Sequence, residues 1–180
     1  RLRAPIGGLP VTSDERFDVL MAAADPPMVV VTTARGGERS GCLVGFHAQT
    51  SIEPPRYAVW LSRANHTYRV ALLATHLAVH FLTADDHDLA AAFGGETGDE
   101  IDKFAGVAWT PGPAGVPLLD RCPHRMVVRR VTLVDDGGDH VGVVTEPIQV
   151  ATAGPFTPLR LSAASHIDAG HPAAEGSAGS

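Results

Sequence analysis

Two histidines have the spacing of a metal site. His76 and His80 are four residues apart, which on a helix would place both imidazoles on one face as zinc ligands. However, Leu77, Val79 and Phe81 alternate along this segment as in a strand, and no Glu follows His76, so the HExxH pattern is absent. The sequence therefore favours a strand here and predicts no metal site.

A thiol lies close to an imidazole in Cys122-Pro123-His124. Nucleophile and base must meet in space, and the strand expected after Pro123 would carry His124 away from the thiol. A small buried thiol beside the start of a strand is the favoured interpretation. The sequence also lacks a GxSxG nucleophile elbow, so it does not favour acyl transfer.

Three further segments stand out by their order along the chain. They are residues 40–55 (SGCLVGFHAQTSIEPP), residues 62–69 (SRANHTYR) and Gly138-Asp139-His140. Together they resemble the flavin reductase-like proteins, an FMN-binding split-barrel family. The resemblance runs from about Pro27 to Pro172. Trp109, followed by a Gly- and Pro-rich segment ending at Leu118, supports the resemblance.

The resemblance implies that Leu43, Val44, Gly45 and Phe46 line the isoalloxazine ring of a flavin. Backbone groups would meet the polar edge of the ring while apolar side chains exclude water. Gly45 suits this role because a residue without Cβ lets the main chain approach a flat ring closely. A mid-strand bulge is the alternative interpretation of this glycine.

The resemblance also assigns Ser62, Asn65, Thr67 and Arg69 to the ribityl and phosphate contacts. Hydroxyl and amide groups can donate to these oxygens, Arg69 can pair with a phosphate, and Thr67 would lie at a helix N-terminus that favours an anion. An ordinary helix cap with an exposed Arg is the alternative. Phe93 matches the family's short helix ending in Phe and is counted with the cofactor-binding residues.

His140 matches the histidine of the family's Gly-Asp-His, on the nicotinamide or substrate side of the flavin. The implied role is substrate positioning or proton handling, because hydride passes directly between the stacked rings. The alternative is a surface histidine in a tight turn.

Two features depart from the family pattern. Leu43 stands where Thr is frequent, and Gly45 and Phe46 stand where Ser or Asn is frequent, so backbone and apolar contacts would replace side-chain hydrogen bonds. Pro147 cannot donate to a sheet ladder, and we expect its strand to end there or to lie at a sheet edge.

The elements that must position these residues are short. We expect several antiparallel strands with two or three short helices, in a mainly β fold: a split antiparallel barrel of six strands with Greek-key connections. No GxGxxG or P-loop is present. Three helices are expected: one capped by Ser13 and ending before Pro26, one over 67–74, and one capped by Asp85 or Asp86 and ending at Gly94-Gly95 in left-handed geometry. The expected strands are 28–33, which is followed by a hairpin turn at 35–38 and another short strand, and 57–61, 77–81, 126–134 and 141–144.

Length and composition predict one domain over residues 1–172 and a flexible tail over 173–180. The net charge of −6 and the lack of a basic cluster argue against nucleic acid as a partner. Apolar runs such as 70–74 fall far short of the roughly 20 residues of a membrane span. Two cysteines without a CxxC pair favour reduced thiols and a cytoplasmic protein.

The resemblance thus implies an NAD(P)H-dependent reductase of FMN or FAD, a homodimer with the flavin at the interface, and a flavin-dependent monooxygenase as recipient of the reduced flavin. One alternative on this scaffold is an oxidase or reductase that retains its flavin or uses a deazaflavin. The other is a non-catalytic flavin or haem carrier.

Overall fold

The computed structural model describes residues 12–95 and 102–167 of the 180-residue chain. The helices are α1 (Ser13–Ala24), α2 (His66–Leu73), α3 (His87–Gly94), α4 (Leu161–Ala164) and the 3₁₀ turn η1 (Pro113–Gly115). The strands are β1 (Val29–Arg35), β2 (Glu38–Val44), β3 (His47–Ser51), β4 (Arg56–Ser62), β5 (His76–Phe81), β6 (Trp109–Pro111), β7 (Pro117–Leu119), β8 (Arg125–Val134) and β9 (His140–Ala151).

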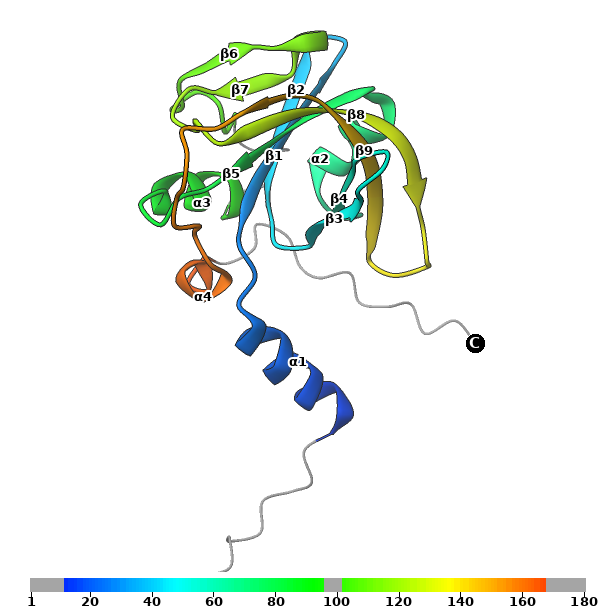
Figure 1. The fold of residues 1–180 in the computed structure, drawn as a ribbon, viewed down its shortest axis with the longest axis vertical. Helices are drawn as coiled ribbons and strands as arrows, with labels where there is room; N and C mark the ends of the chain where they lie inside the picture. The colour runs from blue at the N-terminus through cyan, green and yellow to red at the C-terminus, as the bar shows by residue number, and fades with distance from the viewer. Residues whose placement is uncertain (1–11, 96–101, 168–180) are drawn as a thin grey trace, which may run out of the picture.

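Seven strands form one curled antiparallel sheet in the order β2-β1-β5-β8-β9-β4-β3, and β6 pairs with β7 separately (Figure 1). The two edge strands, β2 and β3, are joined by only Gly45 and Phe46. Because two residues span just a few ångströms, the sheet must curl until its edges approach each other. The fold is a half-barrel with an open seam beside this link. The mainly antiparallel β prediction is confirmed, with seven strands in place of the expected six.

The continuous apolar sequence of β1 follows from burial of both sheet faces. Val29 and Val31 pack inside the curl, in the cluster that includes Ala71 of α2. Val30 points to the other face and packs with Leu89 and Phe93 of α3. Burying apolar area on both faces makes β1 the centre of the fold and fixes the position of β2, its hairpin partner.

The two predicted reversals are confirmed. Gly36 and Gly37 take positive φ angles of 60° and 87° between β1 and β2, as a two-residue hairpin turn requires. Residues 135–139 connect β8 to β9, with Gly137 at φ 88°. The second hairpin places His140 at the start of β9.

Helix ends differ in detail from the prediction. Thr12, not Ser13, caps α1, and it forms a capping box with Glu15. No residue of α1 is buried, although Phe17 and Leu20 have the expected helical spacing. Helix α3 ends at Gly94, but Gly95 has right-handed geometry (φ −87°) and not the expected left-handed one.

Two strand predictions also differ in detail from the structure. Strand β3 was not expected, because His47–Ser51 is partly exposed and has little apolar character. Pro147 does not end β9, which continues to Ala151, but beyond Thr145 the strand pairs with β8 alone, so the proline lies at a local sheet edge as the alternative expectation had it. The proline is tolerated because β4 pairs with β9 only as far as Thr145 and the β8 ladder shifts register near Pro147.

Both cysteines are free and buried. Burial raises the pKa of Cys42 to about 11 and that of Cys122 to about 12, so neither thiol is a ready nucleophile near neutral pH. The imidazole of His124 is engaged with Thr152 and stacks on Phe156, with ring centroids 4.1 Å apart. The structure supports a packing role for both Cys122 and His124.

His80 is a buried neutral histidine in β5. Its Nδ1 lies 3.2 Å from the Val30 carbonyl oxygen, and its Nε2 accepts from the Leu119 backbone N–H at 3.1 Å. One nitrogen donates and the other accepts, which fixes the neutral tautomer. Across residues 12–95 and 102–167, no group of three or more His, Cys, Asp or Glu side chains could hold a metal ion.

This histidine predicts an acid-sensitive fold. Burial lowers the pKa of His80 from 6.5 to about 4, so between these values the unfolded chain binds a proton that the folded chain does not. The free energy of unfolding should therefore fall by about 3 kcal/mol as pH drops through this window. Urea unfolding at a series of pH values measures it. His80→Gln should flatten this part of the profile, whereas an equally steep profile in that variant would show that another group titrates.

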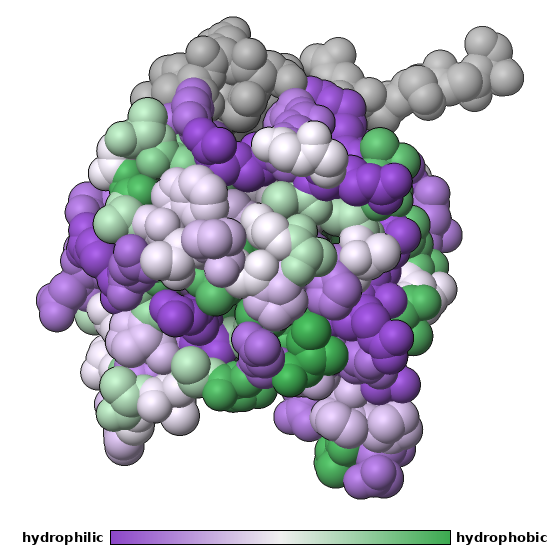
Figure 2. Space-filling view, turned by 90° about the horizontal axis from the view of Figure 1, so that it is seen from above, coloured by the Kyte–Doolittle hydropathy of each residue, from purple (hydrophilic) through white to green (hydrophobic). Residues whose placement is uncertain are grey.

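Within the part of the chain described, no helix has the length and apolar character to cross a membrane. On the face seen in Figure 2, hydrophilic residues cover most of the surface and hydrophobic ones form separate patches. Helix α1 projects away from the sheet (Figure 1), with the side chains of Phe17 and Leu20 61% and 62% exposed.

Candidate functional site

A cleft of about 340 Å³ opens at the seam between the two edges of the sheet. Six chain segments contribute to it: Met28 before β1, the end of β2 with its link to β3, the end of β4, the residue before α2, the start of β9 with Asp139 before it, and the first residue of α4. Its lining includes seven residues singled out from the sequence: Leu43, Val44, Gly45, Phe46, Ser62, Asn65 and His140. Residues nearly 100 positions apart in the sequence therefore meet at one place.

The Gly45–Phe46 link is held firmly at one side of the cleft. The Phe46 carbonyl oxygen accepts from the backbone N–H of Trp60 at 2.8 Å. His47, next in the chain, is fixed by the Tyr57 hydroxyl at 2.6 Å and the Pro27 carbonyl oxygen at 2.8 Å, and burial lowers its pKa. These contacts leave the Phe46 side chain 60% exposed at the mouth of the cleft.

Gly45 lies between two strands and not in the middle of one, so the bulge interpretation does not apply. A Cβ placed there would lie 3.3 Å from Sδ of Met28, which also lines the cleft. The missing Cβ therefore keeps the link close to Met28 at the cleft wall.

Trp60 forms another wall, two residues before Ser62 on the same face of β4. Gly142 on the neighbouring strand β9 pairs with Trp60. A Cβ at Gly142 would lie only 3.0 Å from the indole nitrogen, so a larger residue would crowd the indole. Gly142 thus makes room for Trp60 at the cleft.

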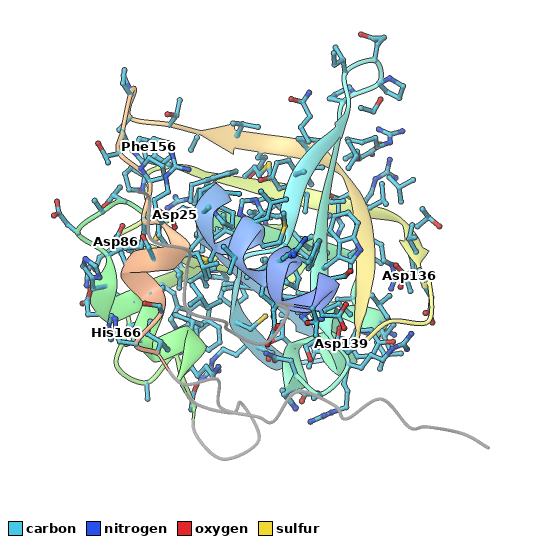
Figure 3. All side chains as sticks on the ribbon, turned by 90° about the horizontal axis from the view of Figure 1, so that it is seen from below. Asp25, Asp86, Asp136, Asp139, Phe156 and His166 are labelled. Carbon is cyan, nitrogen blue, oxygen red and sulfur yellow. The ribbon has the colours of Figure 1, made fainter. Side chains whose placement is uncertain are left out.

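The Gly-Asp-His turn is tied to the end of β4 by Arg63. The Arg63 backbone N–H donates to the Asp139 carbonyl oxygen at 2.9 Å, and Nε of Arg63 donates to the Gly138 carbonyl oxygen at 2.9 Å. The Arg63 guanidinium also pairs with Asp135. Figure 3 shows Asp136 and Asp139 at this end of the β8–β9 hairpin. The turn that carries His140 is therefore anchored to β4.

His140 is oriented by Asp139 and Phe46. Its Nδ1 lies 2.7 Å from Asp139 Oδ1, and this hydrogen bond is the main reason that the pKa of Asp139 is lowered. The imidazole meets the Phe46 ring edge to face, with centroids 5.0 Å apart. Because Nδ1 is engaged with the carboxylate, Nε2 is the nitrogen that can face a bound molecule.

The start of α2 lies at the cleft, but two predicted residues there do not line it. Asn65 is the N-cap, and its Oδ1 accepts from the Thr67 backbone N–H at 2.9 Å. Thr67 is fully buried, with its hydroxyl 2.8 Å from that of Ser40. Arg69 is exposed one turn further along the helix, where its Nη2 lies 3.1 Å from His66 Nδ1. Of the predicted phosphate group, only Ser62 and Asn65 reach the cleft.

Phe93 belongs mainly to the core. Its ring is 1% exposed and lies edge to face with Phe104, with centroids 5.4 Å apart. It also forms part of the wall of a second compartment of about 330 Å³, which adjoins the cleft. Met28, Leu43, Asn65 and Leu161 line both spaces.

Sequence reasoning missed several cleft residues. Asp139 was present in the quoted Gly-Asp-His but was given no role, and Trp60 was treated only as part of a strand. The positions of Met28, Cys42 and Leu161 depend on the curl of the sheet and on the return of the chain at α4. For Trp60 alone, the sequence held a local indication of its place in the cleft: it lies two residues before Ser62, and alternate residues of a strand share a face.

Comparison with known proteins agrees with this arrangement. Residues 21–162 match the family described as flavin reductase like domain. The chain belongs to the flavin reductase-like family. FMN reductase (NADH) SmoA of Agrobacterium fabrum is 30% identical over 137 residues, which are 75% of this chain and 75% of that protein. The NADH:riboflavin 5'-phosphate oxidoreductase of Streptomyces pristinaespiralis is 29% identical over 161 residues, covering 84% of this chain and 85% of the relative.

Other similar proteins are named as parts of larger systems. The reductase subunit HsaB of a flavin-dependent monooxygenase from Mycobacterium tuberculosis is 29% identical over 63% of this chain, and the match spans only 58% of HsaB. In the solved structure of nitrilotriacetate monooxygenase component B from Mycobacterium thermoresistibile, the fold is similar with a TM-score of 0.70 at 22% identity, covering 82% of this chain and 80% of that one.

Proposed function

We propose that the protein is an NAD(P)H-dependent flavin reductase that uses FMN or FAD. The observation that carries this proposal is the cleft at the seam, which gathers Leu43–Phe46, Ser62, Asn65 and His140 from distant parts of the chain. Family membership and the NADH-dependent FMN reductases among the relatives support the same activity.

The residues of the cleft fit a flavin. Leu43, Val44 and Phe46 offer apolar surface to a tricyclic ring, and Gly45 leaves its main chain accessible. Ser62 and Asn65 can hydrogen-bond ribityl hydroxyls, and the first turn of α2 places the positive end of its dipole near the cleft. Thr67 and Arg69 would reach a phosphate only if they moved from their present contacts, so Asn65 carries more of this role than the sequence indicated.

A bound flavin would supply the hydride acceptor, with the nicotinamide as donor. The protein's task is then to hold the two rings in contact and to exclude water. Phe46 and His140 flank the open side of the cleft, where a nicotinamide would approach. His140, oriented by Asp139, would position the donor through Nε2.

The same proposal includes a homodimer with the flavin near the interface. Helix α1 supports it, because Phe17, Leu20 and Met21 lie on one helical face and are 61%, 62% and 42% exposed. A helix of this length is marginal by itself, and a second copy of the chain would cover its apolar face.

Replacing two of these side chains should break the dimer. Phe17→Glu/Leu20→Glu places carboxylates on the apolar face of α1 and should shift the protein from dimer to monomer in sedimentation velocity. Ala22→Glu, on the opposite face of the helix, is the matched control and should remain dimeric. Identical oligomeric states for all three proteins would remove α1 from the interface.

Reduced flavin that leaves the cleft would serve a flavin-dependent monooxygenase, as the relatives named reductase subunits suggest. We propose a cytoplasmic location for this exchange. A protein that keeps its flavin and reduces an organic substrate, or that uses a deazaflavin, is the second candidate. The colour of the protein after gel filtration separates the two candidates. Retained yellow flavin favours the flavin-retaining enzyme, and a colourless protein with full activity on added FMN favours the flavin reductase.

Anaerobic titration tests the activity itself. Purified protein with one equivalent of FMN is titrated with NADH and, separately, with NADPH while the flavin absorbance is recorded. We expect bleaching of the flavin with at least one donor, at a rate well above that of free FMN. Flavin binding without accelerated bleaching would favour a non-catalytic carrier.

A further inference from the structure

A second compartment adjoins the cleft at the expected position of the flavin phosphate. The second compartment lies between α3, α4 and the end of β2, and it shares Met28, Leu43, Asn65 and Leu161 with the cleft. A ligand held in the cleft with its phosphate at Asn65 therefore has open space beyond the phosphate. FMN ends at this point, whereas a dinucleotide continues.

The walls of the second compartment suit a neutral flat group. Leu43, Phe93, Leu161 and Ile167 contribute apolar surface, and Ser165 stands at the exposed rim. None of its described lining residues is Lys, Arg, Asp or Glu. FAD carries a second phosphate between the flavin phosphate and the adenosine, and with no cation in this lining that phosphate would stay toward the solvent, whereas the two faces of the purine would lose water against apolar side chains.

We propose that the second compartment holds the adenosine end of FAD, so that this chain prefers FAD to FMN. This inference rests on the proposed function, because it takes the isoalloxazine to lie in the cleft. The adenosine of the nicotinamide donor has the same chemistry, but the compartment shares Asn65 with the space assigned to the flavin phosphate, while the donor would approach beside Phe46 and His140.

Ser165 offers a way to close the compartment without disturbing the core. It is exposed, it lines the compartment, and its hydroxyl donates only locally, to the Ser162 carbonyl oxygen at 2.8 Å. His166, the next residue, is also exposed but is not part of the lining, and Figure 3 shows it beside α3. Tryptophan at position 165 should fill the space, and tryptophan at position 166 is the matched control.

The test is direct binding of FMN and FAD to the wild-type protein, Ser165→Trp and His166→Trp, measured by isothermal titration calorimetry. We expect wild-type protein to bind FAD about tenfold more tightly than FMN, as burial of one further apolar group allows. Ser165→Trp should lose this advantage with FMN affinity unchanged, and His166→Trp should retain it. Matching circular dichroism spectra and melting temperatures show that the variants are folded.

Other outcomes overturn the assignment. Equal affinity of the wild-type protein for FMN and FAD, or an equal loss of both in Ser165→Trp, would show that the compartment does not select adenosine. A raised KM for NADH in Ser165→Trp with unchanged FAD affinity would assign the compartment to the donor. Failure of the wild-type protein to bind either flavin would instead overturn the proposed function.

Discussion

His140→Ala should slow flavin reduction by about a hundredfold while FMN binding changes by less than threefold, because loss of a positioning contact at the reacting rings affects rate more than affinity. His140 lies at the cleft on the side where the nicotinamide would approach, and it is oriented by Asp139 and Phe46. Stopped-flow reduction of the FMN-loaded protein gives the rate, and calorimetry gives the affinity.

Asp139→Asn provides the companion measurement. An amide oxygen can still accept from Nδ1 but lacks the carboxylate charge, so the hydrogen bond that orients the imidazole is kept and only the charge beside it is removed. We expect a smaller loss of rate than in His140→Ala. Equal losses of rate and FMN affinity in His140→Ala would contradict a positioning role for this histidine.

Phe93→Ala should destabilise the protein by about 3–5 kcal/mol, the usual effect of removing a fully buried aromatic ring. The ring is 1% exposed and packs on Phe104, and the backbone of Gly41 lies directly beneath it. Urea unfolding measures the free energy. FMN affinity, measured where the variant is still folded, should change little, because Phe93 does not line the cleft.

Gly41 gives this prediction an independent check. A Cβ at Gly41 would lie 2.8 Å from Cε1 of Phe93, so Gly41→Ala should cost about 1–3 kcal/mol through overpacking. In a Phe93→Leu background the clash is relieved and the same substitution should cost less. If Phe93→Ala left stability unchanged and abolished flavin binding, the ring would be a cofactor contact and not a core residue.

Local patterns in the sequence predicted the elements with strong turn chemistry. The glycines at 36 and 37 and the Asp135–Gly138 turn placed both hairpins, and the continuous apolar run of β1 reflected burial on both faces. Helix ends were less well predicted because Thr12 and Ser13 are both good N-caps, and only the reciprocal contact with Glu15 decides between them.

The site was predictable where residues adjacent in the sequence share a role. Leu43–Phe46 and His140 line one cleft, because they lie at or directly beside the ends of strands whose register is fixed by a hairpin, while their contact with a flavin stays a prediction. Thr67 was misleading: its hydroxyl suits a phosphate, but helix packing turns it toward Ser40 inside the fold. The contribution of Met28 and Leu161 depends on tertiary contacts that no local pattern encodes.

The position of the bound flavin tests the account most directly. Crystals of the protein grown with FMN should show the isoalloxazine in van der Waals contact with Val44, Gly45 and Phe46, and the phosphate near Asn65 at the start of α2. A flavin bound elsewhere on the protein, with the seam between β2 and β3 closed by side chains, would contradict it.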